Sequence, residues 1–218
     1  MEMTKEERIQ KQRDRLIEMM EREQELRRQG CTHVAGVDEV GRGPLAGPVV
    51  AAAVVLPEDF DVLGVDDSKK LSEKKREELF DLISAKAVGV GLGMASEKEI
   101  DEVNILQATK LAMRRALAEL GENMGEEPDY VLFDAMKIEE VTIPQESIIK
   151  GDAKCTCIAA ASIIAKVTRD RMMVEYASAY PGYAFEKNKG YGTREHYSGL
   201  REFGACSIHR KTFLKKLH

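Results

Sequence analysis

Two adjacent acidic side chains, Asp38 and Glu39, follow an apolar run that begins at Val34. A turn with three glycines, two prolines and one arginine comes next, from Gly41 to Pro48, and a second apolar run begins at Val49. Carboxylates that lie close together repel each other unless a cation is bound between them. Glycine leaves the backbone bare, so a ligand such as a phosphate can approach it closely. Paired acids beside a bare, positively charged loop therefore point to phosphodiester chemistry at a metal ion.

The acidic pair has a second interpretation when it is taken alone. Neighbouring residues of a regular strand face opposite sides of the sheet, so Asp38 and Glu39 converge only where the strand ends or bends, which Gly41 permits. A surface hairpin with both carboxylates in water is the alternative. The G-x-G in the turn does not indicate a dinucleotide site, because Pro44 and Pro48 interrupt the helix that such a motif requires.

Two further acids, Asp134 and Asp152, are explained equally well by chemistry and by local structure. Asp134 ends a predicted strand that begins at Tyr130, and acids are common turn residues at strand ends. Asp152 precedes a predicted helix, where aspartate is a natural N-cap. Asp170 lies eighteen residues later on the same helix, roughly 27 Å away, so it cannot share a metal centre with Asp152. The segment Thr168–Arg171 resembles a salt-bridged helix surface.

Charge is distributed unevenly along the chain. The net charge is −5, but residues 150–218 hold thirteen Lys and Arg against six Asp and Glu, so the first 149 residues carry −12. A basic face suits nucleic acid, although a chance bias on a solvated surface gives the same count. Tyr191 stands between glycines in this region, where a tyrosine either stacks on a sugar or base or caps the core. The run His209–Lys211 suits phosphate contacts or is simply solvated.

The composition fits one soluble domain with small appendages. The chain has 218 residues, of which 43% are hydrophobic and 33% charged. It contains no apolar run of about 18 residues, so no membrane span is expected. The charged N-terminus lacks an apolar signal core, so a cytoplasmic location is expected. The four cysteines form no C-x-x-C pair, and we interpret them as buried thiols rather than zinc ligands.

The apolar pattern predicts a mixed α/β sheet, because strands that follow each other directly are succeeded by strands that alternate with helices. The predicted strands cover residues 33–38, 48–56, 87–94, 130–133 and 146–149. The predicted helices are a charged one over 4–29, one capped by Ser72 that runs to about Ala85, a turn at Ser96 with a helix over 104–120, one over 151–179, and a final basic helix after Gly182.

Six segments closely resemble the bacterial ribonuclease HII family of type 2 ribonucleases H. They appear in the family's order across about residues 33 to 210, at positions 36–49, 67–72, 133–135, 150–154, 158–170 and 190–193. The first and fifth are long and specific. The sister family, ribonuclease HIII, carries a sizeable extra N-terminal domain and a different residue where this chain has Arg42, so the resemblance is to ribonuclease HII.

The resemblance implies a ribonuclease H-like fold, in which a mixed five-stranded sheet is flanked by helices and followed by a small helical C-terminal part. We therefore expect three parts. A charged N-terminal helical arm covers residues 1–30, a ribonuclease H-like catalytic domain covers 31–182, and a basic C-terminal helical segment covers 183–218.

The resemblance also implies the site residues. Four carboxylates map to the catalytic and metal-binding positions, and two divalent ions, Mg²⁺ or Mn²⁺, are the expected cofactors: Asp38, Glu39, Asp134 and Asp152. Seven residues are expected to bind substrate through a Gly-Arg-Gly loop, a tyrosine that reads the junction between RNA and DNA, and three lysines at phosphates: Gly41, Arg42, Gly43, Tyr191, Lys69, Lys70 and Lys154.

The expected activity is hydrolysis of the phosphodiester 5′ of a ribonucleotide, either in an RNA–DNA hybrid or singly embedded in duplex DNA, with a 3′-hydroxyl and a 5′-phosphate as products. Such a nuclease removes misincorporated ribonucleotides from DNA. A monomer is expected, and a sliding clamp is a candidate partner. The alternatives are a non-catalytic hybrid-binding protein on the same fold and another two-metal nuclease such as a junction resolvase. The four acids disfavour the first, since pure binding would remove negative charge near phosphate, and the Gly-Arg-Gly loop with Tyr191 disfavours the second.

Overall fold

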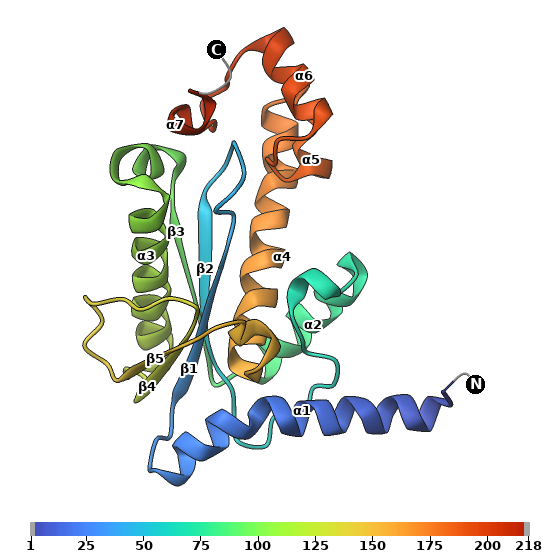
Figure 1. Ribbon diagram of the computed structural model, residues 1–218, viewed down its shortest axis with the longest axis vertical. Coiled ribbons are helices and arrows are strands. Elements are labelled where there is room, and N and C mark those ends of the chain that lie inside the picture. Colours follow the sequence, from blue (N-terminus) through green and yellow to red (C-terminus); the bar gives the residue numbers. More distant parts are fainter. Residues whose placement is uncertain (1–2, 216–218) are drawn as a thin grey trace.

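A mixed five-stranded sheet forms the centre of the molecule (Figure 1). The computed structural model describes residues 3–215. The strands lie in the order β3-β2-β1-β4-β5; β2 pairs antiparallel with β1 and β3, whereas β4 pairs parallel with β1 and β5. Their bounds are β1 Val34–Val40, β2 Val49–Val55, β3 Gly89–Ala95, β4 Tyr130–Asp134 and β5 Gln145–Ile148. The mixed five-stranded sheet expected from the sequence is confirmed.

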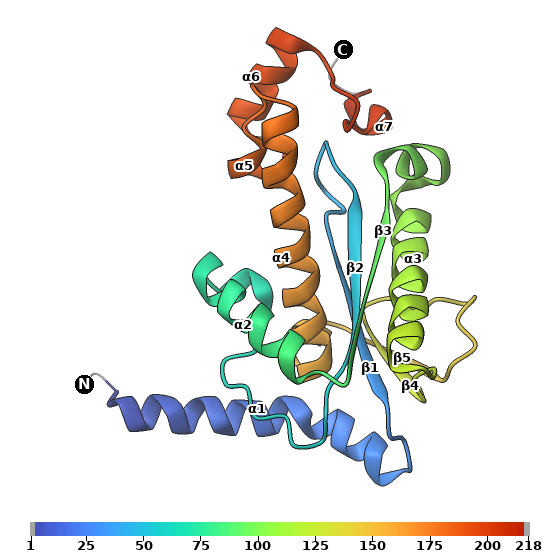
Figure 2. The ribbon, with the colours of Figure 1, turned by 180° about the vertical axis from the view of Figure 1, so that it is seen from behind.

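Two long helices cover the two faces of the sheet, as the front and back views show (Figures 1 and 2). Helix α3 (Glu97–Met124) lies on one face and α4 (Thr156–Ala179) on the other. The strand β2 has the sequence VVAAAVV and is buried along its whole length, with Ala52 and Val54 facing α4 and the alternate residues facing α3. This alternation follows from the two-residue period of a strand.

Helix α4 approaches β1 more closely than a side chain would allow. A Cβ placed on Gly36 would lie 2.2 Å from the backbone carbon of Cys157. The first turns of α4 are rich in alanine, and Ala159, Ala160 and Ala161 are fully buried. Small residues on both elements therefore set the spacing, and they bring the start of α4 beside the acidic end of β1.

The predicted cap at Ser72 is confirmed. The Ser72 side chain accepts a hydrogen bond from the Lys75 amide at the start of α2 (Glu73–Lys86). Ser96 caps α3, and that helix is broken at Asn104, which has a φ of 71°. The Asn104 side chain accepts from the amides of the second segment, at 3.0 Å from the Leu106 nitrogen. The predicted turn at Ser96 and helix from 104 are therefore two segments of one kinked helix.

The prediction that a long helix starts at Gly151 is wrong. Residues Gly151–Ala153 form a separate 3₁₀ turn, η2, and α4 begins only at Thr156. Lys150 enters the turn in the left-handed conformation. Asp152 therefore lies in a short turn of its own and is not the N-cap of α4, a place that Cys155 occupies. Cys155 and Cys157 are buried free thiols, whereas Cys31 and Cys206 are half-buried.

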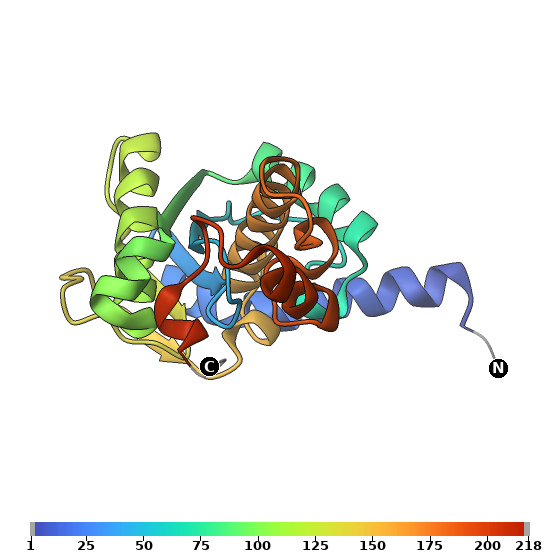
Figure 3. The ribbon, with the colours of Figure 1, turned by 90° about the horizontal axis from the view of Figure 1, so that it is seen from above.

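Between residues 183 and 215, the described part of the C-terminal segment contains three short helices where one final basic helix was predicted. They are α5 (Phe185–Asn188), α6 (Arg194–Phe203) and α7 (Lys211–Leu214). Figure 3 shows them gathered over the end of α4, with α7 reaching toward α3. Asp101 of α3 caps α7 by accepting from the Lys211 and Thr212 amides. Residues 216–218, which also belong to the predicted basic segment, lie outside the described residues.

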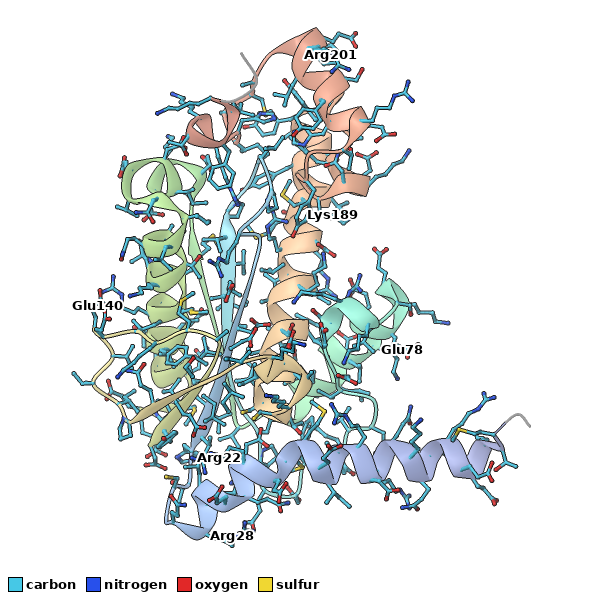
Figure 4. The ribbon with its side chains drawn as sticks, viewed as in Figure 1. Arg22, Arg28, Glu78, Glu140, Lys189 and Arg201 are labelled. Carbon is cyan, nitrogen blue, oxygen red and sulfur yellow. The ribbon has the colours of Figure 1, made fainter. Side chains whose placement is uncertain are left out.

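Helix α1 (Lys5–Arg28) runs across the bottom of the molecule in Figure 1. Its second half docks through buried Leu16, Met19, Met20 and Leu26. Arg22, labelled in Figure 4, forms an ion pair with Glu146 of β5 at 2.6 Å. The second half of the charged arm therefore packs on the domain. Among residues 3–215, none of the helices is both long and apolar enough to span a membrane.

We predict that Gly36→Ala destabilises the fold by about 3 kcal/mol, because the added methyl overpacks the contact between β1 and α4. Gly121→Ala is the matched control: it lies within α3, and its added Cβ meets nothing closer than 3.7 Å. Alanine should raise the stability there by roughly 0.5–1 kcal/mol. Urea unfolding at neutral pH measures both free energies, and equal stability of Gly36→Ala and wild type would contradict the close-approach argument.

Candidate catalytic site

Three aspartates from three different elements meet at the carboxyl end of β4. Asp38 is on β1, Asp134 ends β4 and Asp152 is in η2. Each offers one carboxylate oxygen, and these oxygens all lie within 4.8 Å of one another. The parallel register pairs Val37 with Phe133, which places Asp38 and Asp134 side by side. The structure thus brings together three of the four predicted carboxylates.

Glu39, the fourth predicted carboxylate, lies at the rim of this cluster and outside the 4.8 Å group. The strand β1 continues regularly through Val40, so no bend makes the adjacent acids converge. Asp38 is buried and Glu39 is only half-buried. The Glu39 carboxylate lies 3.3 Å from the guanidinium of Arg42. The end or bend of the strand that convergence of the two acids required is therefore absent at Asp38 and Glu39, although their charges still interact.

Backbone amides hold two of the three aspartates in place. The Gly151 amide donates to Asp134 at 2.8 Å, and the Glu39 amide donates to Asp38 at 2.8 Å. Ser162 on α4 lies beside Asp38 and partly offsets the rise in the pKa of that carboxyl group. Ser162 lies 2.9 Å from the hydroxyl of Ser68, which ties α4 to the loop of the predicted substrate lysines.

The backbone beside the cluster is strained. Ala135, directly after Asp134, has a φ of 47°, and Lys150, two residues before Asp152, has a φ of 58°. Left-handed conformations cost non-glycine residues roughly 1–2 kcal/mol each. The surrounding fold therefore holds both aspartates in place at an energetic cost.

Burial and the charges of neighbouring acids disfavour the charged form of Asp38 and Asp152. Burial, and then the charge of Glu39, raise the pKa of Asp38 to about 8. Burial and the charge of Asp134 raise the pKa of Asp152 as well. Lys69 is the nearest cation, 3.4 Å from Asp152; burial alone would lower its pKa, but the carboxylates of Asp152 and Asp38 raise it. One lysine does not neutralise the cluster, so its donor set of hard oxygens fits a divalent cation such as Mg²⁺ or Mn²⁺.

The Gly-Arg-Gly loop stands open beside the cluster. Gly41 has a φ of +92°, which only glycine adopts readily. Arg42 and Gly43 are exposed. Tyr191 is 44% exposed, and its ring edge lies 3.5 Å from where a Cβ on Gly43 would be. The tyrosine is therefore not a cap over the core, and it lies next to the loop with which the sequence pairs it.

Two buried arginines hold this loop from below. The sequence context had indicated a solvated helix surface for Arg169 and phosphate contacts or solvation for Arg210. Both interpretations are wrong, because the two side chains are 0% exposed. Burial lowers the pKa of Arg169 to about 10 and that of Arg210 to about 9. Their guanidinium groups donate to backbone carbonyls of Gly41, Arg42, Ala46, Gly47, Pro48 and Lys189. The loop geometry thus depends on residues far away in sequence.

The remaining predicted substrate residues lie at different places. Lys69 is at the cluster. Lys70 forms an ion pair with Asp66 at 3.1 Å and lines a hollow of about 580 Å³ against α1. Lys154 is exposed next to η2. Asp170 pairs with Lys166 at 2.7 Å and is outside the cluster, as its helical distance from Asp152 predicts.

Sequence reasoning missed Ser162 and Arg169 as supports of the site. Both lie on α4, seven residues apart, which is about two turns and hence one helix face. A lone serine and a lone arginine on a face otherwise made of alanine and isoleucine were the available signal. Arg210 gave no such signal, because it lies in an irregular segment beside another basic residue.

The strand order, the two covering helices and the acids at the ends of neighbouring strands define a ribonuclease H-like fold. Ribonuclease H2 from Pyrococcus horikoshii OT3 is 29% identical, with a TM-score of 0.66 over 83% of this chain and 93% of that one. RNase HII from Archaeoglobus fulgidus, solved in complex with PCNA, is 29% identical, with a TM-score of 0.68 and the same coverage. Bst-RNase HIII, solved with Mn²⁺, is 21% identical (TM-score 0.60, 80% of this chain and 64% of that one) and shares the fold.

The sequence comparisons are more specific. The family model described as Ribonuclease HII matches residues 35–217. Ribonuclease HII of Bacillus mycoides (strain KBAB4) is 56% identical over 204 residues, which are 94% of this chain and 77% of the relative. The chain belongs to the ribonuclease HII family. It is a ribonuclease H, an endonuclease that acts on RNA–DNA substrates by hydrolysis.

The raised pKa of Asp38 predicts how the stability of the metal-free protein varies with pH. The folded protein keeps a proton that the unfolded chain releases, so this contribution is full below about pH 3.8 and is lost as the pH rises through about 8. Asp38→Asn removes it. In the presence of EDTA, the melting temperature of wild type should therefore fall relative to that of Asp38→Asn as the pH rises toward 8. Parallel melting curves for the two proteins would contradict the assignment.

Proposed function

We propose that this enzyme cuts the phosphodiester on the 5′ side of a ribonucleotide, either in an RNA–DNA hybrid or singly embedded in duplex DNA. The products are a 3′-hydroxyl and a 5′-phosphate, and the role is removal of misincorporated ribonucleotides. The observation that carries the proposal is the buried cluster of Asp38, Asp134 and Asp152 beside the exposed Arg42–Gly43 loop and Tyr191. Membership of the ribonuclease HII family supports it.

Two divalent ions, Mg²⁺ or Mn²⁺, are the proposed cofactors. Asp38, Asp134 and Asp152 would hold them, with Glu39 at the rim as the fourth carboxylate. The Mn²⁺ complex of Bst-RNase HIII supports such binding on this fold. When bound, divalent ions supply activation of the attacking water and stabilisation of the leaving 3′ oxygen. The protein's own contribution is to hold the acids close together, with the Gly151 amide donating to Asp134 and Ser162 lying beside Asp38.

Selection of a ribonucleotide requires contact with the 2′-hydroxyl, the group that distinguishes RNA from DNA. The backbone of Gly41 and Gly43 and the Arg42 side chain are the proposed contacts, and the exposure of Arg42 and Gly43 supports this. Arg42 has Glu39 as its partner in this structure, 3.3 Å away, and so connects the recognition loop to the catalytic carboxylates. The exposed Tyr191 ring would stack on the following deoxyribose.

Lysines around the site would contact the phosphate backbone. Lys69 lies against Asp152 and is 76% exposed on its side chain, so it can face both the acids and a bound strand. Lys70 and Lys154, exposed on either side, and the basic C-terminal segment would extend this contact. Such contacts position a duplex without reading its sequence.

A sliding clamp is the proposed protein partner, and a monomer the proposed state. The support for the clamp is the structure of RNase HII from Archaeoglobus fulgidus in complex with PCNA. The cytoplasmic location and the division into residues 1–30, 31–182 and 183–218 stay predictions from the sequence.

Cleavage of a labelled DNA duplex that carries one ribonucleotide tests the proposed activity. Wild type with Mg²⁺ or Mn²⁺ should give a single nick 5′ of the ribonucleotide. Asp134→Asn keeps an oxygen that can accept from Gly151 but loses the charge, so kcat should fall about a thousandfold, which corresponds to roughly 4 kcal/mol. An all-DNA duplex is the negative control. If wild type binds the duplex but never cuts it, the protein is a binding module on this fold.

A further inference from the structure

Two buried histidines lie next to each other behind Tyr191. His196 is on α6, and His209 is in the segment between α6 and α7. They are 0% and 2% exposed, and their rings pack against Tyr183 and Phe185. Neither is among the ion pairs found within residues 3–215. A pair of imidazoles placed in an apolar pocket without a carboxylate is built to stay neutral.

The hydrogen-bond partners fix the proton on each ring. The Cys206 amide lies 2.9 Å from His209 Nδ1, and a backbone N–H can only donate. His209 Nδ1 is therefore unprotonated, and the ring carries its proton on Nε2. That nitrogen lies 2.9 Å from Nε2 of His196, which must accept. The His196 proton is then on Nδ1, 2.9 Å from the carbonyl oxygen of Tyr191, which can only accept.

The result is a hydrogen-bond chain with one direction, from the Cys206 amide through both rings to the Tyr191 carbonyl. A second proton on either ring would place two N–H groups against each other or against the Cys206 amide. Burial lowers the pKa of both rings, that of His209 to about 4, which keeps the chain intact at neutral pH. The other titratable side chains that face the pair are Cys206 and Tyr183.

The segment that holds His209 also holds the glycine loop. The Gly47 amide donates to the Ile208 carbonyl at 2.9 Å, and the Arg210 amide donates to the Leu45 carbonyl at 2.9 Å. Between these two contacts, His209 reaches through His196 to Tyr191. One short stretch, 208–210, therefore sets the loop and the tyrosine relative to each other.

We propose that His196 and His209 are positioning residues. They hold Tyr191 beside the Gly-Arg-Gly loop, where its ring meets the substrate. The proposal rests on the proposed contact between Tyr191 and the substrate. Neither histidine touches the substrate, and both act through the Tyr191 backbone. Their removal should weaken the use of the substrate and leave the carboxylate cluster unchanged.

Three variants separate this role from simple packing. His196→Phe fills the space of the ring but removes both nitrogen contacts. His196→Asn places an amide nitrogen near the position of Nδ1, so it can still donate to the Tyr191 carbonyl. His33→Phe is the matched control, because His33 is a half-buried histidine that takes no part in this hydrogen-bond chain. On the single-ribonucleotide duplex we expect about a tenfold rise in KM for His196→Phe, a smaller rise for His196→Asn and none for His33→Phe. Stabilisation by Mn²⁺ should be the same in all three.

A double-mutant cycle with Tyr191→Ala is the decisive readout. Tyr191→Ala alone should lower kcat/KM about tenfold or more. If His196 acts through Tyr191, adding His196→Phe to Tyr191→Ala should lower it no further. A second full loss in the double variant, wild-type KM in His196→Phe, or wild-type activity in Tyr191→Ala would each overturn the positioning role. Failure of wild type to cut the duplex would instead overturn the proposed activity.

A measurement on the unsubstituted protein covers the case in which a variant fails to fold or wild type does not cut. Nitrogen NMR of the imidazole rings reports which nitrogen carries the proton. We expect the Nδ1–H form for His196 and the Nε2–H form for His209 at neutral pH. The Nε2–H form for His196, or a charged ring on either residue, would overturn the chain and with it the proposal.

Discussion

Electrostatic repulsion among buried carboxylates is the constraint around which this molecule is organised. Asp38, Asp134 and Asp152 offer oxygens within 4.8 Å of one another, and the cluster has one lysine as its nearest cation. Each comes from a separate element, so no local structure brings them together. The parallel pairing of β1 with β4, the close packing of α4 on Gly36 and the strained turns at Ala135 and Lys150 do so jointly. The fold thus holds these acids together at a cost to its own stability.

Positive charge in the same region is divided between Arg42, which is exposed in the proposed recognition loop, and two buried arginines that shape the backbone of that loop. Arg169 and Arg210 donate only to carbonyls, which fixes the glycine loop while Arg42 stays exposed above it. The paired histidines add an uncharged link from the same C-terminal segment to Tyr191. The C-terminal segment therefore acts as the support of the recognition loop, and its buried basic residues are not phosphate contacts.

The sequence predicted the sheet because its strands are short apolar runs bounded by turns, and it predicted the acids because they end those runs. It did not predict the separate turn at Gly151, since a 3₁₀ turn and the start of a helix have the same local pattern. The burial of Arg169, Arg210 and His209 was also missed. Arg169 and Arg210 donate to backbone carbonyls far away in the chain, and His209 contacts the His196 side chain and the Cys206 amide. The sequence around each of the three residues does not indicate these partners.

Thermal unfolding with and without Mn²⁺ tests the central claim most directly, when wild type is compared with Asp134→Asn. We expect Asp134→Asn to melt at a higher temperature than wild type in EDTA, because one repelling charge is gone. We also expect Mn²⁺ to raise the melting temperature of wild type by about 5–10 °C at roughly a hundredfold excess over its Kd, and that of the variant much less. A wild type that ignores Mn²⁺, or a variant that is less stable in EDTA, would contradict the claim.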